Sequence, residues 1–534
     1  MLPFSAPVDD ILWSLEFAGA SGIPDWDRDL TAEIVQHFAA FAQGRIAPLD
    51  DAGDKQGCRL QNGRVVMPDG FDAVFRELAC GGWQGLSAPE EFGGQGMGGA
   101  VHAAISEIFS GACHSLQMVT GLVPGAVRLL MQYGTDDQKA RFIPPLVSGD
   151  WLATMCLTEP GAGSDLSAIR TKAEGAGQSW QITGEKIFIS GGDHNLSDNI
   201  LHLVLARTGP EGVKGLSLFA CPAVMDGGAR NAVTVTRIEE KMGLHASPTC
   251  QMAFDGAQGE LIGAPGQGLA AMFTLMNHAR LDVALQGVAH ATRAYGVASA
   301  YAADRVQGRG VDGQPVTLDR HADVRRMIAR ADALAVSARA ISHSALVALE
   351  TGNQPLADFL TPMAKVCGSD AGTQAAELAM QVLGGYGYLH EYRVEQTYRD
   401  ARICAIYEGT NGIHATTIAT RGLSYDGGVQ ADAFAAWIDQ IADAQSADFL
   451  RNALQEWTDL RDVTRAAPRE LAHIFMQVSI ALADLGFWVR VRGSDSAPSR
   501  MQALARERCA LLPGQVAHLA AQARVMAQLA GDAQ

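Results

Sequence analysis

The sequence predicts an α+β fold that is mainly α-helical, with a block of β-strands between helical regions. Three observations predict it. Apolar residues recur at helical spacing from about residue 34 to 149. Short β-type runs bounded by Gly, Asp, Asn or Pro occupy residues 152–261, and long Ala-rich helical periods begin at residue 268. The order helices, strands, helices, helices therefore describes the chain.

Five regions follow from these patterns. An N-terminal extension covers 1–33, and a helical N-terminal domain covers 34–151, where VHAAISEIFSGAC and GAVRLLMQY have helical periods. A middle antiparallel β domain spans 152–262 with runs such as SWQITGEKIFIS and ILHLVLAR. A helical bundle follows over 263–424. The Gly-rich break SYDGGVQAD then opens an additional C-terminal helical domain over 425–534.

Composition narrows the class of protein. With 534 residues and 48% hydrophobic composition, the chain can bury several cores without disulfides or metals. Its nine cysteines form no CxxC pair and no alternating Cys/His spacing, which argues against a disulfide framework and a zinc site and favours a reducing cytoplasm. The N-terminus lacks the pattern of an export signal, and charge interrupts the most apolar stretches, as Asp484 does in SIALADLGFWV. We expect no membrane span.

The net charge of −17 argues against nucleic-acid binding, which needs clustered Lys and Arg to neutralise phosphates. A CoA ligand stays possible, because a few local Arg side chains suffice for one small polyanion. Gly94, Gly96 and Gly99 match GxGxxG, but the preceding APEEF is a poor strand and no βαβ unit surrounds them. We therefore expect no nicotinamide-binding fold.

Three segments carry a family resemblance. They are MCLTEPGAGSD (Met155 to Asp165), KIFISGG (Lys186 to Gly192) and QVLGGYGYLHEYRVEQTYRDARICAIYEGTNGIHA (Gln381 to Ala415). In this order they resemble the signature regions of acyl-CoA dehydrogenases, and matching blocks span about residues 34–422. The resemblance implies that family's fold, with FAD as cofactor and an acyl-CoA as substrate. The two terminal extensions are similar to the longer bacterial type that includes 3-methylmercaptopropionyl-CoA dehydrogenases.

The segment TEPGAGSD also has a direct chemical interpretation. Its glycines and proline favour a tight loop whose amide groups, with the hydroxyls of Thr158 and Ser164, can bind a polar ligand; an ordinary strand-connecting turn is the alternative. The resemblance implies that the loop holds the flavin and that Ser164 also lies near the CoA pyrophosphate. The flavin contacts implied in this region are Met155, Leu157, Thr158, Gly163, Ser164 and, along the isoalloxazine ring, Phe188, Ile189 and Ser190.

In this family other flavin contacts come from a neighbouring subunit, which implies at least a homodimer. The matching positions are Arg305 and the turn containing Gln381, Gly384 and Gly385. Taken alone, Arg305 would be a solvated charge at a helix end, and the segment after it differs in length from the family's short pattern. Thr410 matches a further flavin-contacting residue.

The reaction needs a hydride acceptor, which is the flavin, and a base for the Cα proton. Glu408, in IYEGTNG, lies in a predicted turn before a helix that starts near Asn411. A capping charge is the alternative interpretation of such a Glu. By resemblance Glu408 occupies the position of the catalytic glutamate, and its own amide, with a flavin hydroxyl, polarises the thioester carbonyl. The position used as base in some branches is Ala279 here.

Four further residues are expected at the substrate. Arg280 and Asn277 match positions near the active site, although Arg280 can also be interpreted as a helix charge that reaches solvent. Tyr407 and Gly409 flank the predicted base and leave room for a ligand. We interpret the nearby His390 and His414 as structural.

These residues predict FAD-dependent oxidation of an acyl-CoA to its trans-2-enoyl-CoA, with electrons passed to an electron-transfer flavoprotein. An acyl-CoA oxidase is an alternative that the motifs do not separate. A flavin-containing DNA-associated stress protein is another alternative, which predicts a basic C-terminal region. From Ser424 on, however, the sequence has thirteen acidic residues, ten Arg and no Lys, which argues against it. The substrate stays open between 3-methylmercaptopropionyl-CoA, favoured by the layout, and a plain short or medium chain.

Overall fold

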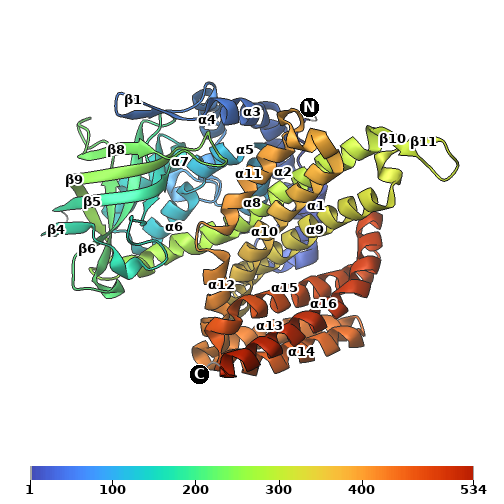
Figure 1. The fold of residues 1–534 in the computed structure, drawn as a ribbon. Helices are drawn as coiled ribbons and strands as arrows, with labels where there is room; N and C mark the ends of the chain where they lie inside the picture. The colour runs from blue at the N-terminus through green and yellow to red at the C-terminus, as the bar shows by residue number, and fades with distance from the viewer. Residues whose placement is uncertain (1–2, 178, 533–534) are drawn as a thin grey trace. The chain divides into compact units, whose positions relative to one another are not determined.

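The computed structural model describes residues 3–177 and 179–532, without the side chains at 176, 277, 278 and 530–532. The chain divides into two compact units (Figure 1). The β-containing unit combines Pro3–Ala6 with Ile34–Ala279, and the helical unit combines Pro7–Glu33 with Arg280–Gln534. The predicted class, α+β and mainly α, is confirmed.

The first half of the β-containing unit is helical. After α2, which begins in the other unit, the helices are α3 (Ala47–Gln56), α4 (Phe71–Cys80), α5 (Gly99–Thr120), α6 (Val123–Tyr133) and α7 (Asp136–Ser148). α2 itself spans Arg28–Phe41. A capping box starts α7, because the hydroxyl of Thr135 accepts from the amide of Gln138 and the side chain of Gln138 accepts from the amide of Thr135.

A short hairpin interrupts this region, which the helical periods did not predict. β1 (Arg59–Gln61) pairs with β2 (Arg64–Val66) in antiparallel register. The two residues between them, Asn62 and Gly63, have φ values of 52° and 74°. Asn-Gly is the residue pair that this tight turn favours, because both positions require a positive φ.

A seven-stranded sheet forms the rest of this unit. Its strands are β3 (Trp151–Cys156), β4 (Lys172–Ala176), β5 (Ser179–Ser190), β6 (Asn199–Arg207), β7 (Leu216–Pro222), β8 (Val233–Ile238) and β9 (Thr249–Ile262). The order is β3-β6-β4-β5-β9-β7, with β8 paired to β9 beside this path. Because β6 also pairs with β7, the sheet closes on itself. Most pairs are antiparallel as predicted, but β6 runs parallel to both β3 and β4. Alternation of apolar residues indicates which face of a strand is buried, but it does not indicate whether neighbouring strands run parallel or antiparallel.

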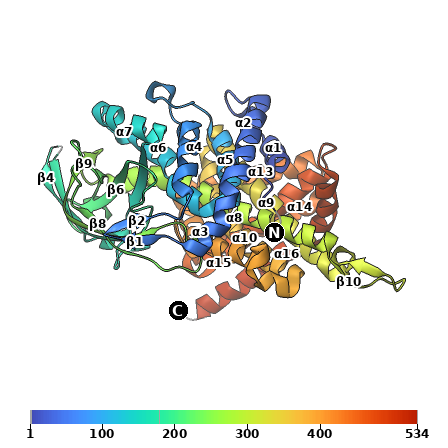
Figure 2. The same ribbon diagram turned by 90° about the horizontal axis from the view of Figure 1, so that it is seen from above.

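Long helices build the core of the helical unit. They are α8 (Gly268–Asp304, shared with the other unit), α9 (Ala322–Glu350), α10 (Gln354–Leu383), α11 (Val394–Ala401) and α12 (Asn411–Thr417). α8 and α10 approach closely at Gly287, which has no side chain to prevent it. A Cβ at this position would lie 2.1 Å from the carbonyl oxygen of Gly368. A hairpin of β10 (Val306–Arg309) and β11 (Pro315–Thr317) follows α8 and extends away from the bundle (Figure 2).

The C-terminal region adds four helices to this unit. They are α13 (Val429–Ala444), α14 (Asp448–Ala466), α15 (Pro468–Arg492) and α16 (Ser499–Asp532). Trp457 and Trp488 are fully buried among them. By length and composition α15 could cross a membrane, but 78% of its apolar window is buried inside the fold. α15 is therefore a core helix of this unit.

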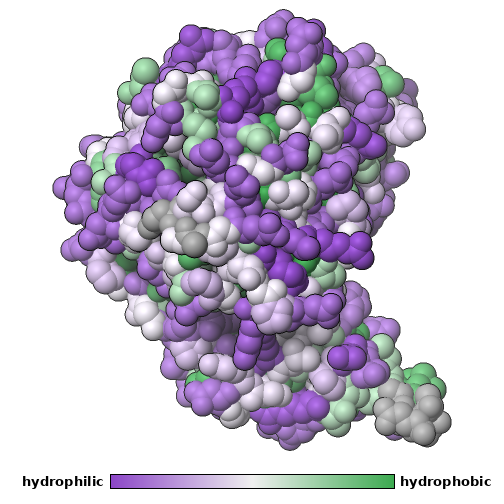
Figure 3. Space-filling view, turned by 90° about the vertical axis from the view of Figure 1, so that its left-hand side faces the viewer, coloured by the Kyte–Doolittle hydropathy of each residue, from purple (hydrophilic) through white to green (hydrophobic). Residues whose placement is uncertain are grey.

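Hydrophilic residues dominate the face of the molecule drawn in Figure 3, where hydrophobic residues occur in small groups.

The N-terminal helix α1 (Val8–Ala18) packs mainly against α9 and also contacts the C-terminal helices. Phe17 contacts Phe487 edge to face at 5.7 Å, and the guanidinium of Arg490 lies 4.4 Å from the Phe17 ring centre. Arg500 on α16 forms an ion pair of 2.6 Å with Asp10. The two terminal regions, predicted as separate extensions, thus share one core.

Candidate active site

A sharp turn presents the predicted base. Glu408 and Gly409 have φ values of 52° and 90°, so two successive residues are left-handed between the 3-10 turn Arg402–Ala405 and α12. The hydroxyl of Thr410 then caps α12 by accepting from the amide of Ile413 at 3.3 Å. The predicted helix start at Asn411 is confirmed.

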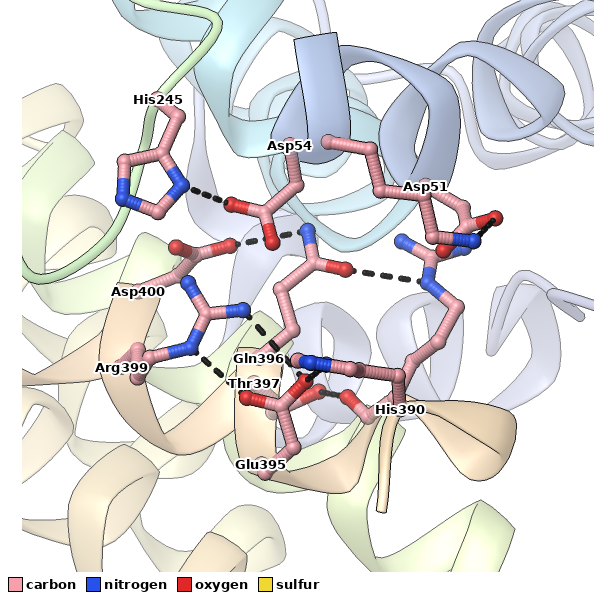
Figure 4. Close-up of polar contacts among 11 residues, drawn as sticks. Asp51, Asp54, His245, His390, Glu395, Gln396, Thr397, Arg399 and Asp400 are labelled. Atoms are coloured by element: carbon pink, nitrogen blue, oxygen red, sulfur yellow. Dashed lines mark hydrogen bonds and ion pairs between the residues drawn. The ribbon is translucent and has the colours of Figure 1, made fainter. Parts of the chain in front are cut away.

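Helix α11 precedes this turn in the chain, and polar pairs join several of its side chains (Figure 4). Arg399 forms an ion pair of 2.7 Å with Glu395, whose other oxygen lies 2.6 Å from Nδ1 of His390. On the next face of the same helix, Gln396 donates to a carboxylate oxygen of Asp400 at 3.2 Å. The two pairs that lie within α11 join residues four apart and stabilise this short helix.

Both carbonyl groups of the turn are bound from other elements. Nζ of Lys365 on α10 donates to the carbonyl of Gly409 at 2.7 Å. Nε2 of His414 on α12 lies 3.0 Å from the carbonyl of Glu408 and must donate to it. Burial lowers the pKa of His414 to about 3, so its ring is neutral. The hydroxyl of Tyr407 donates to the side chain of Gln286 on α8.

The carboxyl group of Glu408 is shielded from solvent at Oε2, which has no hydrogen-bond partner among the described residues. Loss of hydration raises the pKa of Glu408 to about 7, while the charges of Arg280 and Lys365 act in the opposite direction. A carboxylate with this pKa is a stronger base than an ordinary Glu, whose pKa is about 4.3. The turn therefore holds one carboxyl group suited to proton abstraction near neutral pH.

The structure brings some predicted substrate residues together. Arg280 on α8 is half-buried and lies close enough for its charge to act on Glu408. Tyr407 and Gly409 are adjacent to Glu408 in the turn. Asn277 is part of α8, but its side chain lies outside the described part of the chain.

In the β-containing unit, an ion pair fixes the TEPGAGSD loop. Lys186 on β5 is fully buried, and its Nζ donates to Glu159 at 2.8 Å and to the carbonyl of Leu157 at 2.9 Å. Glu159 also accepts from the amides of Arg170 and Thr171 at 2.7 Å and 3.0 Å. The buried carboxylate thus satisfies three donors and ties the loop to its sheet.

The part of the loop beyond this anchor is open. A Cβ built on Gly161 or Gly163 would meet no atom within 4 Å, and Ser164 is exposed. Met155 and Thr158 are half-buried, and Leu157 is buried. The loop therefore presents its glycine backbone and a hydroxyl at the surface of this unit, as a ligand-binding loop requires.

A β-bulge places the predicted aromatic contact. The register of β5 against β9 shifts between Lys186 and Ile189, and Phe188 within the bulge has a φ of 59°. Phe188 is 61% exposed, whereas Ile189 beside it is buried. Ser190 is half-buried at the end of the strand. The bulge therefore exposes the ring of Phe188, which the regular alternation of a strand would not explain.

A pocket of about 550 Å³ in the helical unit contains the second group of predicted cofactor residues. Arg305, Gly384 and Gly385 line it, together with Gln307 of β10. Gln381 is exposed at the end of α10 and is not among the lining residues. The extra length after Arg305, noted in the sequence, is the β10–β11 hairpin, whose first strand forms part of the wall.

These residues are chemically suited to FAD. The exposed face of Phe188 suits a flat ring, and the open loop around Gly163 suits polar groups of the cofactor. The pocket with Arg305 suits a phosphate, because a guanidinium donates to phosphate oxygens in a fixed geometry.

Sequence reasoning missed several residues that support the site. Lys365, Gln286 and the pair of Glu159 with Lys186 were not singled out. The signal for Lys365 was a single lysine in the segment TPMAKVCGSDAG, and the pair lay inside two matched motifs. Their partners are distant in sequence, so only the fold identifies them.

Comparison with known proteins agrees with this architecture. Models of the acyl-CoA dehydrogenase N-terminal, middle and C-terminal domains match residues 29–150, 154–257 and 266–423. The chain is 41% identical over 465 residues to the 3-methylmercaptopropionyl-CoA dehydrogenase of Ruegeria pomeroyi, covering 82% of this chain and 79% of the relative. It is 34% identical over 461 residues to the broad-specificity linear acyl-CoA dehydrogenase FadE5 of Mycobacterium tuberculosis, covering 80% and 75%.

A solved structure extends the likeness to the C-terminal helices. The acyl-CoA dehydrogenase from Bacillus anthracis, solved with FAD, has a TM-score of 0.78 at 20% identity over 94% of this chain and 89% of its own. At this identity it shows the fold. Taken with the domain matches and the relatives above 30% identity, the chain belongs to the acyl-CoA dehydrogenase family of FAD-dependent oxidoreductases.

Proposed function

We propose that this enzyme oxidises the Cα–Cβ bond of a short or medium acyl-CoA to the trans-2-enoyl-CoA and that Glu408 is its base. The observation that carries the proposal is the carboxyl group of Glu408, shielded at Oε2 and held in a left-handed turn of the signature motif. Bound FAD supplies the hydride acceptor for the Cβ hydrogen.

The residues of the turn have distinct tasks. The ionised Glu408 takes the proton from Cα. No backbone hydrogen bond of the described residues uses the amide of Glu408, so that amide is available to the thioester carbonyl and favours charge on its oxygen. Arg280 contributes positive charge beside the base, and Tyr407 and Gly409 border the substrate.

The cofactor residues of this proposal are those named from the motifs. The β-containing unit provides the ring and loop contacts, which are Met155, Leu157, Thr158, Gly163, Ser164, Phe188, Ile189 and Ser190. Thr410 is a further contact, and Asn277, Arg280 and Ser164 contact the substrate. Arg305, Gln381, Gly384 and Gly385 serve the flavin of a second copy, so the enzyme is at least a homodimer. The family resemblance and the pocket at Arg305 support this.

Substrate and pathway rest on the relatives. The protein at 41% identity is named for 3-methylmercaptopropionyl-CoA, and the one at 34% for linear acyl-CoA chains. We favour the thioether substrate, which would place the enzyme in dimethylsulfoniopropionate breakdown in the cytoplasm, with an electron-transfer flavoprotein as acceptor. A thioether and a methylene are nearly isosteric, so apolar contacts separate them by only about 1–3 kcal/mol.

An anaerobic titration tests substrate and class together. We expect 3-methylmercaptopropionyl-CoA to bleach the flavin about tenfold or more faster than butyryl-CoA or octanoyl-CoA, in line with that difference in free energy. Turnover with an artificial acceptor and then with oxygen separates a dehydrogenase from an oxidase. Faster bleaching by a plain chain would assign the enzyme to β-oxidation, and no bleaching by any thioester would overturn the proposed function.

The pKa of Glu408 predicts the pH dependence of activity. The base must be ionised, and its pKa is raised to about 7. We therefore expect kcat/KM to be level above about pH 7 and to fall tenfold for each unit below it. An ordinary Glu would keep the rate level down to about pH 5. Stopped-flow flavin bleaching across this range measures the effect, and a flat profile through pH 7 would contradict it.

A further inference from the structure

Lys365, the cationic residue of α10, reaches the turn of the base. Lys365 is 0% exposed, and its Nζ donates to the carbonyl of Gly409 at 2.7 Å and to Oδ1 of Asn411 at 3.1 Å. Asn411 in turn donates to Ser369 at 3.1 Å and to Asp370 at 2.9 Å, one turn further along the same helix. One face of α10 therefore binds the residues that follow Glu408.

We propose that Lys365 is a positioning residue for the base, which holds the left-handed turn through two hydrogen bonds and favours the ionised carboxylate of Glu408 through its charge. The proposal rests on the assignment of Glu408 as the base. The sequence predicted no residue of α10 near the base. Under this proposal α10 has a direct effect on proton abstraction.

The geometry requires a donor at this position. A buried ammonium is costly unless its protons are bound, and Lys365 donates to Gly409 in the turn and to Asn411, the first residue of α12. Burial lowers the pKa of Lys365 to about 8, which leaves most of the amine protonated at neutral pH. The amine thus provides both hydrogen bonds and charge in the range where the enzyme is expected to work.

The conformation of the turn depends on such ties. A left-handed conformation at a residue with a side chain, as at Glu408, costs free energy and persists only where surrounding contacts impose it. The carbonyl of Glu408 itself is bound by His414, and a Cβ on Gly409 would lie 3.1 Å from Nε2 of that ring. Lys365 and His414 therefore constrain consecutive peptide groups.

The charged surroundings of this amine are defined. The groups that act on Lys365 are Cys404, Glu408, Asp370 and Arg280. The buried thiol of Cys404 has a pKa raised to about 12 and is neutral, and Asp370 is bound by Asn411. Arg280 also favours ionised Glu408. Loss of Lys365 removes one of two cations that keep the pKa of Glu408 from rising further.

The variant Lys365→Met in the FAD-loaded enzyme separates positioning from simple packing. We expect kcat to fall at least tenfold with KM little changed, since the base loses its orientation and ground-state binding is retained. The acid limb of kcat/KM should move to higher pH by about one unit or more, because a nearby opposite charge lowers a carboxyl pKa by that amount. Lys365→Arg keeps the charge, so its limb should stay near pH 7 while kcat falls.

Lys214→Met, at an exposed lysine in the 3-10 turn Val213–Gly215, is the control for loss of a charge and should leave both readouts unchanged. If Lys365→Met does not fold with FAD, Lys365→Gln takes its place with the same expected shift. An acid limb that stays at the wild-type pH in the neutral variant would overturn the proposal. Full activity of Glu408→Gln would instead overturn the base assignment, so the two failures are distinct.

Discussion

Glu408→Gln is expected to lower the rate of flavin reduction by acyl-CoA by roughly 10²–10⁴-fold, the range that a positioned general base contributes. The amide has nearly the same size and cannot accept the Cα proton. Because Oε2 of Glu408 has no partner among the described residues, the substitution breaks no hydrogen bond there. FAD content and thermal stability should therefore be retained, which separates loss of the base from loss of the fold.

Glu391→Gln is the matched control, since Glu391 is exposed in the 3-10 turn His390–Tyr392 of the same motif. It should keep the wild-type rate. Rapid-mixing absorbance of the oxidised flavin measures both variants under anaerobic conditions. A rate within about threefold of wild type for Glu408→Gln would exclude Glu408 as the base.

Lys186→Met is expected to lower the free energy of unfolding of the β-containing unit by about 3–5 kcal/mol, because it leaves a buried carboxylate without its cation. Burial disfavours the ionised form of Glu159. The charge of Lys186 and the hydrogen bonds that Glu159 accepts outweigh this effect, so the pKa of Glu159 lies below its ordinary value. Removing the ammonium also frees the carbonyl of Leu157. The loop should loosen, and the isolated enzyme should contain less FAD.

Two controls identify the cause. Lys172→Met removes an exposed lysine on β4 of the same sheet and should change the free energy of unfolding by less than about 0.5 kcal/mol. The double variant Lys186→Met with Glu159→Gln removes both charges and should recover a large part of the loss. Denaturant unfolding followed by tryptophan fluorescence gives the comparison. Equal stability of Lys186→Met and wild type would show that the pair is not a structural anchor.

The sequence was most informative where local signals act. Periods of apolar residues predicted the helical and β blocks, and Gly-rich segments predicted the break at Tyr425–Gly428. The Asn62–Gly63 turn carried an equally clear local signal, and it was overlooked within a block of helical periods. Strand direction in the β3–β6 pair and the bulge at Phe188 depend on pairing between distant segments, which alternation does not encode.

The site shows the same division. Glu408 was found because it lies in a contiguous motif. Lys365 lies 44 positions before its acceptor Gly409, and no spacing rule connects a helix interior to a turn so far away. Composition does mark such residues, because a lysine in a long, mostly apolar helix is costly to bury without a partner. A search for isolated charges in apolar helices would have selected it.

The contact of α1 with α15 and α16 bears on synthesis of the chain. The helical unit is discontinuous, and the β-containing unit, apart from Pro3–Ala6, is one uninterrupted stretch. On the ribosome that stretch can condense as soon as it emerges, whereas Phe17 and Asp10 wait for Phe487 and Arg500. At about 5–20 residues per second, the interval is roughly 25–95 s. During it α1 can already pack against α9, but the side of α1 that carries Phe17 and Asp10 lacks its C-terminal partners, so the core that joins the two ends of the chain closes last.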